Sequence, residues 1–244
     1  MELRGMVVVN GMAQLVDNDE IAQMLRKRHQ EKAQRNVVRP GTAPPLRTRG
    51  TDRQLVVLQP RDAGEPTDTV GQVGFGGAPQ LFDAGLKLLY YGMESGDSET
   101  LLAIRKGVDG PQSIEAGKRV ITAGMKLSIM VILGIAGKEG SERHALATAK
   151  AISEIQPTML SALCLMLYRG SELKDQFERG EFHPLSPGGL MHELQLMLEN
   201  IHLPEGCHTL FRSNHVSNYV NFAGTLPKDQ ERLIREVAMA AGEL

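Results

Sequence analysis

The sequence is poor in cysteine and in aromatic residues, and it contains no tryptophan. Its two cysteines, Cys164 and Cys207, stand far apart and form no CxxC pair. This spacing argues against a disulfide framework and against a metal site made by cysteines of this chain alone. Aromatic residues make up only 4% of the chain, so the core must be mostly aliphatic.

Long apolar runs and a strong charge imbalance are also absent. No run approaches the roughly 20 residues of a membrane-spanning helix, and the N-terminus lacks the pattern of a signal peptide. The formal net charge is -2, which favours neither nucleic acid nor an anionic membrane as a partner. We therefore expect a cytoplasmic protein. Its 244 residues are enough for one sizeable core, alone or with an appendage.

The first 34 residues predict one strand–loop–helix unit. The apolar run Met6–Val9 is rich in β-branched residues, and Asn10-Gly11 follows it. The next stretch, 17–34, has acidic residues at its start and basic residues later, and Asp17 or Asn18 can cap it as a helix.

Residues 35–80 show no sustained periodicity and are rich in Gly, Pro and Thr. Only Gln54–Gln59 predicts a strand. We expect most of this segment to be poorly ordered, because it offers little apolar surface to offset the entropy of ordering it. Its basic residues could contact phosphates. A solvated segment is favoured, because no aromatic platform is interleaved with them.

From Leu81 onward, apolar runs alternate with amphipathic segments. The strands are expected within 86–92, 126–135 and 158–168, and the helices within 97–107, 111–124, 141–155 and 186–201, with a closing helix capped at Thr225. Residues 81–200 thus form a barrel-like half, and 201–244 form a C-terminal extension with that helix. Such alternation predicts an α/β fold with parallel strands joined by right-handed connections.

Ligands of parallel α/β sheets lie on the loops after the carboxyl ends of the strands. The candidate loops are 92–97, 134–143 and 168–173. In the first, Glu94 lies between two glycine-containing turns and could accept hydrogen bonds from a ribose or an ammonium group; alternatively, it could cap the following helix. The second loop, Gly134–Gly140, matches neither GxxxxGK[ST] nor GxGxxG, and alone it favours a plain turn.

The C-terminal part gives little support for a zinc site or for a hydrolytic triad. His202, Cys207, His208 and His215 lie near one another in sequence, but their spacing fits no familiar zinc pattern. Ser-His-Asp catalysis lacks a GxSxG elbow. The stretch Phe211–Val220 is dense in polar side chains, which either line a site or satisfy backbone groups around a turn. We favour the site, and its candidate substrate-side residues are Arg212, Ser213, Asn214 and His215.

Several stretches of the sequence together resemble one enzyme family. LKLLYYGMESGDSETLLAIRKGV resembles the fourth-strand region of radical S-adenosylmethionine (radical SAM) enzymes, and ILGIAGKEGSERHALAT resembles their fifth-strand loop and helix. LMLYRGSELKDQFERGEF resembles the stretch after their sixth strand. FRSNHVSNYVNFAGTLPKD resembles the C-terminal tail of a branch grouped with oxygen-independent coproporphyrinogen oxidases. VVVNGMAQLVDNDEIAQML resembles the second strand, with Met12 in place of an acidic residue.

The resemblance implies a partial TIM-type (β/α) barrel that holds a SAM-like small molecule. Asn10 and Gly11 would receive the amino group. Glu94, Ser95 and Gly96 would supply polar contacts, and Gly134 and Ile135 would flank the adenine. The family cleaves SAM with a 4Fe–4S cluster, and the resulting deoxyadenosyl radical abstracts a hydrogen atom from the substrate.

The sequence departs from the family at the cluster. No CxxxCxxC loop is present, and two cysteines cannot replace it. The resemblance therefore predicts a truncated radical SAM protein that is inactive alone and cannot ligate the cluster by itself. Two alternatives stay open: a non-catalytic ligand-binding or interaction module built on the barrel fragment, and a different nucleotide-binding α/β enzyme.

Overall fold

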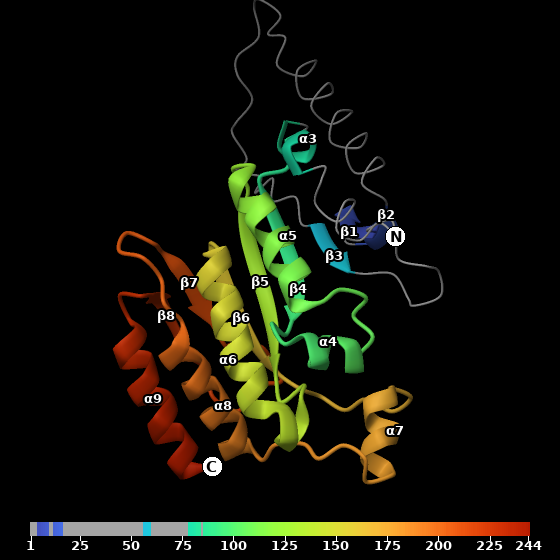
Figure 1. Ribbon diagram of the computed structural model, residues 1–244, viewed down its shortest axis with the longest axis vertical. Helices are drawn as coiled ribbons and strands as arrows, with labels where there is room; N and C mark the ends of the chain where they lie inside the picture. The colour runs from blue at the N-terminus through green and yellow to red at the C-terminus, as the bar shows by residue number, and fades with distance from the viewer. Residues whose placement is uncertain (1–3, 10–11, 17–55, 60–77, 84) are drawn as a thin grey trace, which may run out of the picture.

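The chain folds around one mixed sheet. The computed structural model describes residues 4–9, 12–16, 56–59, 78–83 and 85–244 (Figure 1). The strand order is β2-β1-β3-β4-β5-β6-β7-β8, where β1 is Arg4–Val9, β2 is Met12–Val16 and β8 is Ala223–Leu226. The parallel strands are β3 (Val56–Gln59), β4 (Leu88–Glu94), β5 (Lys126–Leu133), β6 (Met159–Cys164) and β7 (Thr209–Arg212).

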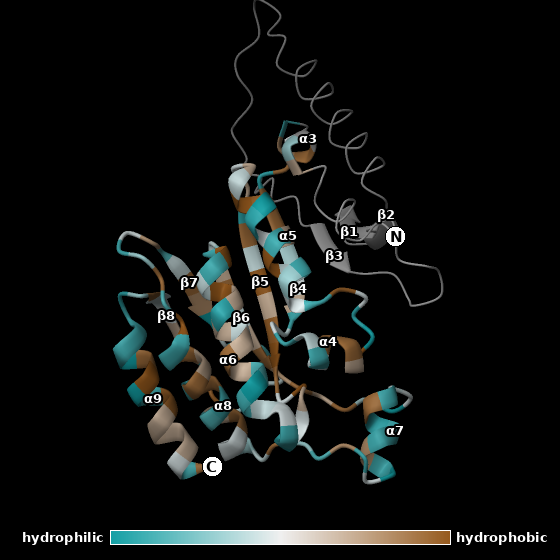
Figure 2. Ribbon diagram, in the orientation of Figure 1, coloured by the Kyte–Doolittle hydropathy of each residue, from teal (hydrophilic) through white to brown (hydrophobic). Residues whose placement is uncertain are grey.

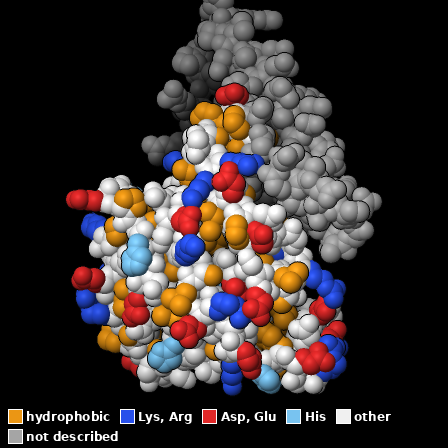
Figure 3. Space-filling view, viewed as in Figure 1, with side chains coloured by type: hydrophobic (Ala, Val, Ile, Leu, Met, Phe, Trp, Pro, Cys, Tyr) orange, Lys and Arg blue, Asp and Glu red, His pale blue; other side chains and the backbone are white. Residues whose placement is uncertain are grey.

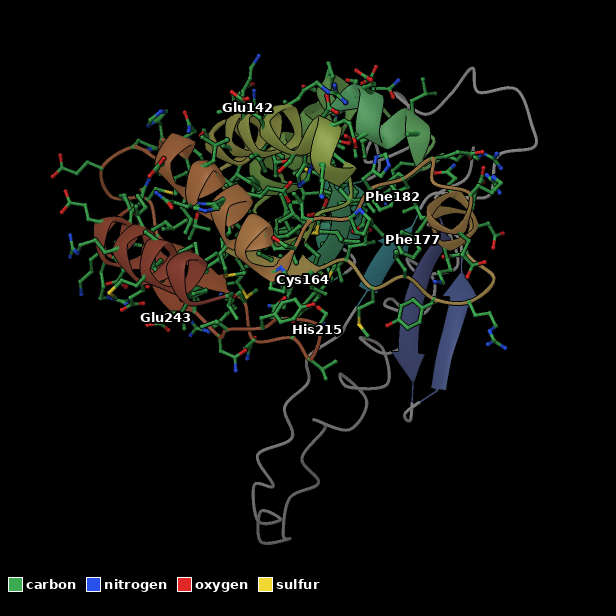
Figure 4. The ribbon with its side chains drawn as sticks, turned by 90° about the horizontal axis from the view of Figure 1, so that it is seen from below. Glu142, Cys164, Phe177, Phe182, His215 and Glu243 are labelled. Carbon is green, nitrogen blue, oxygen red and sulfur yellow. The ribbon has the colours of Figure 1, made fainter. Side chains whose placement is uncertain are left out.

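The described helices are α3 (Ala78–Asp83), α4 (Ser98–Ala103), α5 (Gly110–Thr122), α6 (Gly137–Ile155), α7 (Glu172–Glu178), α8 (Pro187–Asn200) and α9 (Gln230–Glu243). Helices α5, α6 and α8 form a second layer on one face of this sheet. Figure 4 shows α5, α6 and α8 on the same side of the strands. Consecutive parallel strands that lie in chain order, with their helices on one face, are wound as in a (β/α) barrel rather than a doubly wound sheet. The predicted α/β fold class is confirmed.

Alternation along the strands separates a buried face from an open face. On β5, Leu127, Ile129, Val131 and Leu133 are buried against the helices. Leu160 and Ala162 of β6 and Phe211 of β7 continue this core. Apolar colour accordingly follows β5 in Figure 2, while the helices present hydrophilic residues outward. On the face shown in Figure 3, basic and acidic side chains of the described residues lie side by side, without a large patch of one sign.

The starts of α4, α5 and α8 agree with the expected ranges, whereas α7, which Ser171 caps, was not expected. Asp97 caps α4, Ser186 caps α8, and Pro111 lies in the first turn of α5. The prediction for α6 was wrong, because this helix begins at Gly137 and Ser141 lies inside it. The prediction that Thr225 caps the last helix was also wrong: Thr225 belongs to β8 (Ala223–Leu226), and α9 follows Asp229.

The N-terminal unit differs from the predicted one in the part that is described. The strand predicted at Met6–Val9 is present as β1 (Arg4–Val9), but it pairs antiparallel with both β2 (Met12–Val16) and β3. It therefore does not take the place of a parallel barrel strand that the resemblance implied. Asn10, Gly11 and the helix predicted over 17–34 lie outside the described residues. The strand predicted at Gln54–Gln59 is confirmed as β3.

The C-terminal extension contributes strands as well as a helix. β7 pairs parallel with β6 and antiparallel with β8, so the extension completes the sheet edge, and α9 packs on α8. Within the described part of the chain, no helix combines the length and apolarity needed to span a bilayer. Most of the segment 35–80 lies outside the described residues, so its expected disorder stays a prediction.

Candidate functional site

Three neighbouring strands bring their carboxyl ends to one rim of the sheet. Glu94, the last residue of β4, pairs with Val131 of β5. Leu133, the last residue of β5, pairs with Cys164, the last residue of β6. The backbone N–H of Leu165 continues this pairing by donating to the carbonyl of Leu133 at 2.9 Å. The predicted convergence of these loop ends on one rim is confirmed.

Glu94 turns back over its own strand. Its φ of 64° is left-handed, and the register between β4 and β5 shifts at Gly92/Glu94. A Cβ at Gly92 would lie 2.5 Å from Glu94 Oε1, so the carboxylate occupies the space that a side chain at Gly92 would fill. A non-glycine residue in this conformation costs of order 1–3 kcal/mol, and such residues cluster at functional sites.

Lys106 meets this carboxylate from the residues after α4. Its Nζ donates to Glu94 Oε1 at 3.0 Å, and the two side chains are only 9% and 19% exposed. The pair is thus held largely out of water, with Glu94 Oε2 free of a partner among the described residues. That oxygen can accept a hydrogen bond, and the ammonium retains further N–H donors.

The alternative role of Glu94 as a helix cap is excluded by the cap of α4. Asp97 accepts from the backbone N–H of Thr100 at 2.9 Å and supplies that cap. Arg143 of α6 donates from Nε to the same Asp97 oxygen at 2.9 Å. Burial alone would raise the pKa of Asp97, but hydrogen bonds from Thr100 and Arg143 outweigh burial and lower it. The α4 end of the rim is therefore fixed by charge and by capping.

Ser95 and Gly96 face inward rather than toward a ligand. Ser95 is fully buried, and its Oγ lies 2.8 Å from His144 Nδ1 and accepts from the N–H of Asp97 at 3.0 Å. The N–H of Gly96 donates to Thr148 Oγ1 at 2.9 Å, and a Cβ there would collide with the carbonyl of Ala147. These two predicted contact residues hold the loop against α6, and their predicted contact with a ligand stays a prediction.

Gly134 and Ile135 form the neighbouring loop after β5. Gly134 has φ +80°, and a Cβ on it would lie 2.7 Å from Leu190 Cδ2, so glycine is required here for two reasons. Its N–H donates to Glu193 Oε1 at 2.6 Å. Ile135 is 6% exposed and packs inward. Their predicted place beside an adenine stays a prediction.

Glu193 and His144 are buried behind these loops. Glu193 of α8 accepts from Gly134 N and, at 2.5 Å, from Ser141 Oγ. Burial raises the pKa of Glu193 to about 7 and lowers the pKa of His144 to about 4. His144 Nε2 lies 3.8 Å from Glu193 Oε1 and has no hydrogen-bond partner among the described residues. Together the two side chains connect the loops after β4 and β5.

The series Ser95, His144 and Glu193 has the residue types of a hydrolytic triad. Their burial argues against that use, because both Ser95 and His144 are fully buried and no substrate carbonyl could reach the hydroxyl. The Ser95 oxygen also accepts from the Asp97 amide. The three residues therefore support the rim from behind.

The substrate-side residues predicted after β7 separate into two groups. Arg212 and His215 are exposed, and Figure 4 shows His215 on the side of the sheet opposite α5, α6 and α8. Asn214 is also exposed, whereas Ser213 is buried and bonds locally, since its Oγ accepts from the N–H of Phe222 at 3.0 Å. Ser213 thus stabilises the β7–β8 turn.

Asn218 uses its side chain to satisfy backbone groups, which is one of the two roles that the sequence allowed for the polar residues of Phe211–Val220. Its Oδ1 accepts from the N–H of Cys164 at 2.8 Å, and its Nδ2 donates to the carbonyl of Ala162 at 2.9 Å. β7 ends beside Ser161, so no strand pairs with β6 next to Ala162 and Cys164. The side chain of Asn218 forms these hydrogen bonds in place of a strand and holds the loop after β7 against β6.

The two cysteines lie at opposite ends of the sheet. Cys164 ends β6, while Cys207 precedes β7, which runs parallel to β6. The length of β6 from Met159 to Cys164, roughly 16 Å, already separates Cys164 from the start of β7, which Cys207 precedes. Burial raises the pKa of the Cys164 thiol to about 11, which disfavours the thiolate that binds metal. No group of metal-ligating side chains gathers within the described ranges.

Lys106, His144 and Glu193 were not singled out from the sequence, although the last two leave a signal. Glu193 lies three residues after Leu190 and four before Met197, on the apolar face of its helix. His144 shares a face with Thr148. An ionisable residue in such a position must find a buried partner. Lys106 gave no such signal. The helix was expected within 97–107, which puts Lys106 in its last turn, whereas α4 ends at Ala103.

Comparisons with known proteins give one partial structural similarity. No family model matches the chain, and no curated protein matches it. One similar solved structure is Elp3 of the archaeon Methanocaldococcus infernus with its N-terminus (1–46) deleted, at 18% sequence identity and a TM-score of 0.48. The match covers 67% of this chain and 38% of the Elp3 chain. A similarity of this size establishes neither a family nor a function.

Proposed function

We propose that this chain is a radical SAM-type protein that binds a SAM-like nucleoside at the carboxyl rim of β4 and β5. On this proposal it does not carry out the radical reaction by itself. The observation that carries the proposal is Glu94: a strand-end carboxylate in a left-handed conformation, turned over Gly92 and paired with the largely buried Lys106.

The rim offers chemistry that suits a nucleoside with an amino-acid tail. Glu94 Oε2 can accept from a ribose hydroxyl or from an ammonium group, and the Lys106 ammonium can donate to a carboxylate. The resemblance places the adenine beside Gly134 and Ile135, on the loop that follows β5 at the same rim. The resemblance of residues 211–229 to the coproporphyrinogen oxidase-like branch extends this proposal to the branch level.

The residues of this chain do not fit a 4Fe–4S cluster. A cluster needs several converging thiolates, whereas the chain has two cysteines, placed at opposite ends of neighbouring strands. In radical SAM enzymes the cluster supplies the electron that cleaves SAM, and here such a cluster would have to be held by cysteines of another polypeptide. This mismatch favours, as a second candidate, a non-catalytic module that binds the nucleoside and does not react with it.

Calorimetric titration with S-adenosylhomocysteine tests the binding proposal. We expect saturable binding to the wild-type chain and a roughly tenfold or larger loss in Glu94→Gln, because one hydrogen bond to a charged group is worth about 1.5–3 kcal/mol. Glu115→Gln on the exposed face of α5 is the matched control and should bind as the wild type does. Equal binding by wild type and Glu94→Gln would contradict the site.

Iron and sulfide content after anaerobic reconstitution tests the claim about the cluster. We expect no stoichiometric cluster and no deoxyadenosine from SAM and a reductant. A full cluster with deoxyadenosine formation by the isolated chain would overturn this part of the proposal. Nucleoside binding without cleavage supports both a radical SAM-type protein that is inactive alone and a non-catalytic binding module. Cleavage that is restored by adding a cysteine-bearing partner chain would select the radical SAM-type protein.

A further inference from the structure

The open face of the sheet carries a row of side chains whose chemistry changes from one end to the other. In the strand register, Gly92 lies beside Met130, Met130 beside Ser161, and Ser161 beside Arg212. Each of these residues alternates with buried neighbours that face the helices, so the row lies on the face opposite α5, α6 and α8. Three strand spacings separate its ends, roughly 14 Å.

The middle of this row is an apolar floor. Met130, Ile132 and Leu163 are partly exposed on it, and Ile132 and Leu163 are paired in the register one step nearer the rim. Leu210 of β7, one step farther from the rim, is 41% exposed. An apolar body of a ligand could therefore lie across β5 and β6.

Arg212 ends the row with an exposed guanidinium. Its Nη1 donates to the carbonyl of Phe211 at 2.9 Å, which anchors the side chain. Its remaining N–H groups have no partner among the described residues, and no carboxylate is paired with it there. A planar guanidinium with free donors suits a carboxylate or phosphate, which it can bind in a bidentate manner.

The opposite end of the row is occupied by the ion pair of Glu94 and Lys106, whose two charges cancel. Glu94 and Lys106 lie over Gly92, so this end offers one acceptor and one cation without excess charge. At the β7 end of the row, Arg212 is a cation with no carboxylate paired to it among the described residues, so a ligand with one oxyanion would be oriented with that group on Arg212.

From this row we infer that the open face binds a small molecule with an apolar body and one carboxylate or phosphate group. Its oxyanion lies on Arg212, and its body crosses Met130 toward Glu94. The inference rests on the proposed function, because it places this small molecule beside the proposed nucleoside site. It assigns Arg212 as the residue that selects the substrate class.

Calorimetric titration with octanoate, octyl phosphate and neutral octanol tests the inference. The wild-type chain should bind both anions at least tenfold more tightly than octanol, and Arg212→Gln should abolish that preference. Arg235→Gln, a change at an exposed arginine of α9, is the matched control and should retain it. The two anions distinguish a carboxylate subsite, which favours octanoate, from a phosphate subsite, and either preference supports the inference.

Charge reversal separates recognition from damage to the fold. Arg212→Glu should lose octanoate binding and gain binding of octylammonium, which a merely unfolded variant would not do. Absence of an anion preference in the wild type, or its persistence in Arg212→Gln, would overturn the inference. If the wild type shows no anion preference while S-adenosylhomocysteine binding still depends on Glu94, only this inference fails. If the anion preference depends on Arg212 while S-adenosylhomocysteine binding does not depend on Glu94, only the proposed nucleoside site fails.

Discussion

His144 Nε2 and Glu193 Oε1 lie 3.8 Å apart in the interior, between α6 and α8. Each member is shifted toward its neutral form, the carboxyl to a pKa of about 7 and the imidazole to about 4. Asp97 lies close enough to raise the pKa of His144 slightly, against the larger effect of burial. Gly134 N and Ser141 Oγ are the groups that bond Glu193.

This pair predicts two opposing pH dependences of the free energy of unfolding. Glu193 has a raised folded pKa, so the folded state binds more protons and stability falls as pH rises from about 4.5 to 7. His144 has a lowered folded pKa, so stability rises as pH rises from about 4 to 6.5. Each shift corresponds to about 3 kcal/mol, and the two nearly cancel between pH 4.5 and 6.5.

Single substitutions should expose each dependence. In Glu193→Gln, stability should rise by about 3 kcal/mol between pH 4 and 6.5 relative to the wild-type profile. In His144→Asn, stability should fall by a similar amount between pH 4.5 and 7. Urea unfolding at a series of pH values checks both, with the double variant as control. Parallel profiles for the wild type and both single variants would contradict buried neutral forms.

Gly134→Ala should destabilise the chain more than Gly170→Ala does. Both glycines have φ of 80–85°, but nothing lies within 4 Å of a Cβ at Gly170, whereas one at Gly134 meets Leu190 Cδ2. We expect a cost of about 1 kcal/mol at Gly170 from backbone strain. At Gly134 we expect about 2–4 kcal/mol, because overpacking adds to the strain. Chemical denaturation measures the difference, and equal costs would mean that the β5 loop can shift freely.

Asn218→Ala should loosen the loop after β7 without unfolding the sheet. The side chain bonds Cys164 N and Ala162 O, and Ser217 Oγ also accepts from Cys164 N at 3.1 Å, so part of the contact remains. The expected cost is about 1–2 kcal/mol. Faster hydrogen exchange at the Cys164 amide checks this, and Asn218→Asp, which retains the acceptor, should protect that amide better than alanine does.

Asp97 should matter more as a helix cap than as a charge. Asp97→Asn retains a good N-cap and should cost less than about 1 kcal/mol, because Arg143 is 46% exposed and its ion pair is screened. Asp97→Ala removes the cap and should cost about 2 kcal/mol. The lowered pKa makes the charge contribution present above pH 3.8 and lost as pH falls through the folded pKa. Thermal unfolding at pH 7 and pH 2.5 checks this, and equal losses in both variants would contradict it.

Elements with local signals were predictable from the sequence. The runs at β4, β5 and β6 are continuous and apolar, and Asp97 and Ser186 are capping residues of standard type, so strands and helix starts followed from short stretches. α6 was misplaced because Gly137 starts it without a capping side chain, and Ser141 resembled a cap. β2 was missed because Asn10-Gly11, which follows the first apolar run, was interpreted as the start of a loop, although Asn-Gly is equally typical of a hairpin turn between two strands.

The site was only partly predictable, since its partners meet through tertiary packing. Glu94 was found because a carboxylate at a strand end between glycines is unusual in sequence. Its ion pair with Lys106 depends on where α4 ends, and the pairing of His144 with Glu193 joins residues 49 positions apart. Ser213 was taken for a site residue because its inward hydrogen bond to Phe222 is visible only when β8 folds back on β7.

Amide chemical-shift mapping with S-adenosylmethionine tests the central claim most directly. In a nitrogen-15 labelled wild-type chain, the account predicts that the largest changes lie at 92–97 and 134–136, with Lys106 affected. The same titration of Glu94→Gln should reduce those changes strongly. Changes centred on the β7–β8 edge or on α9, or no saturable change at any amide, would contradict a nucleoside site at the carboxyl rim of β4 and β5.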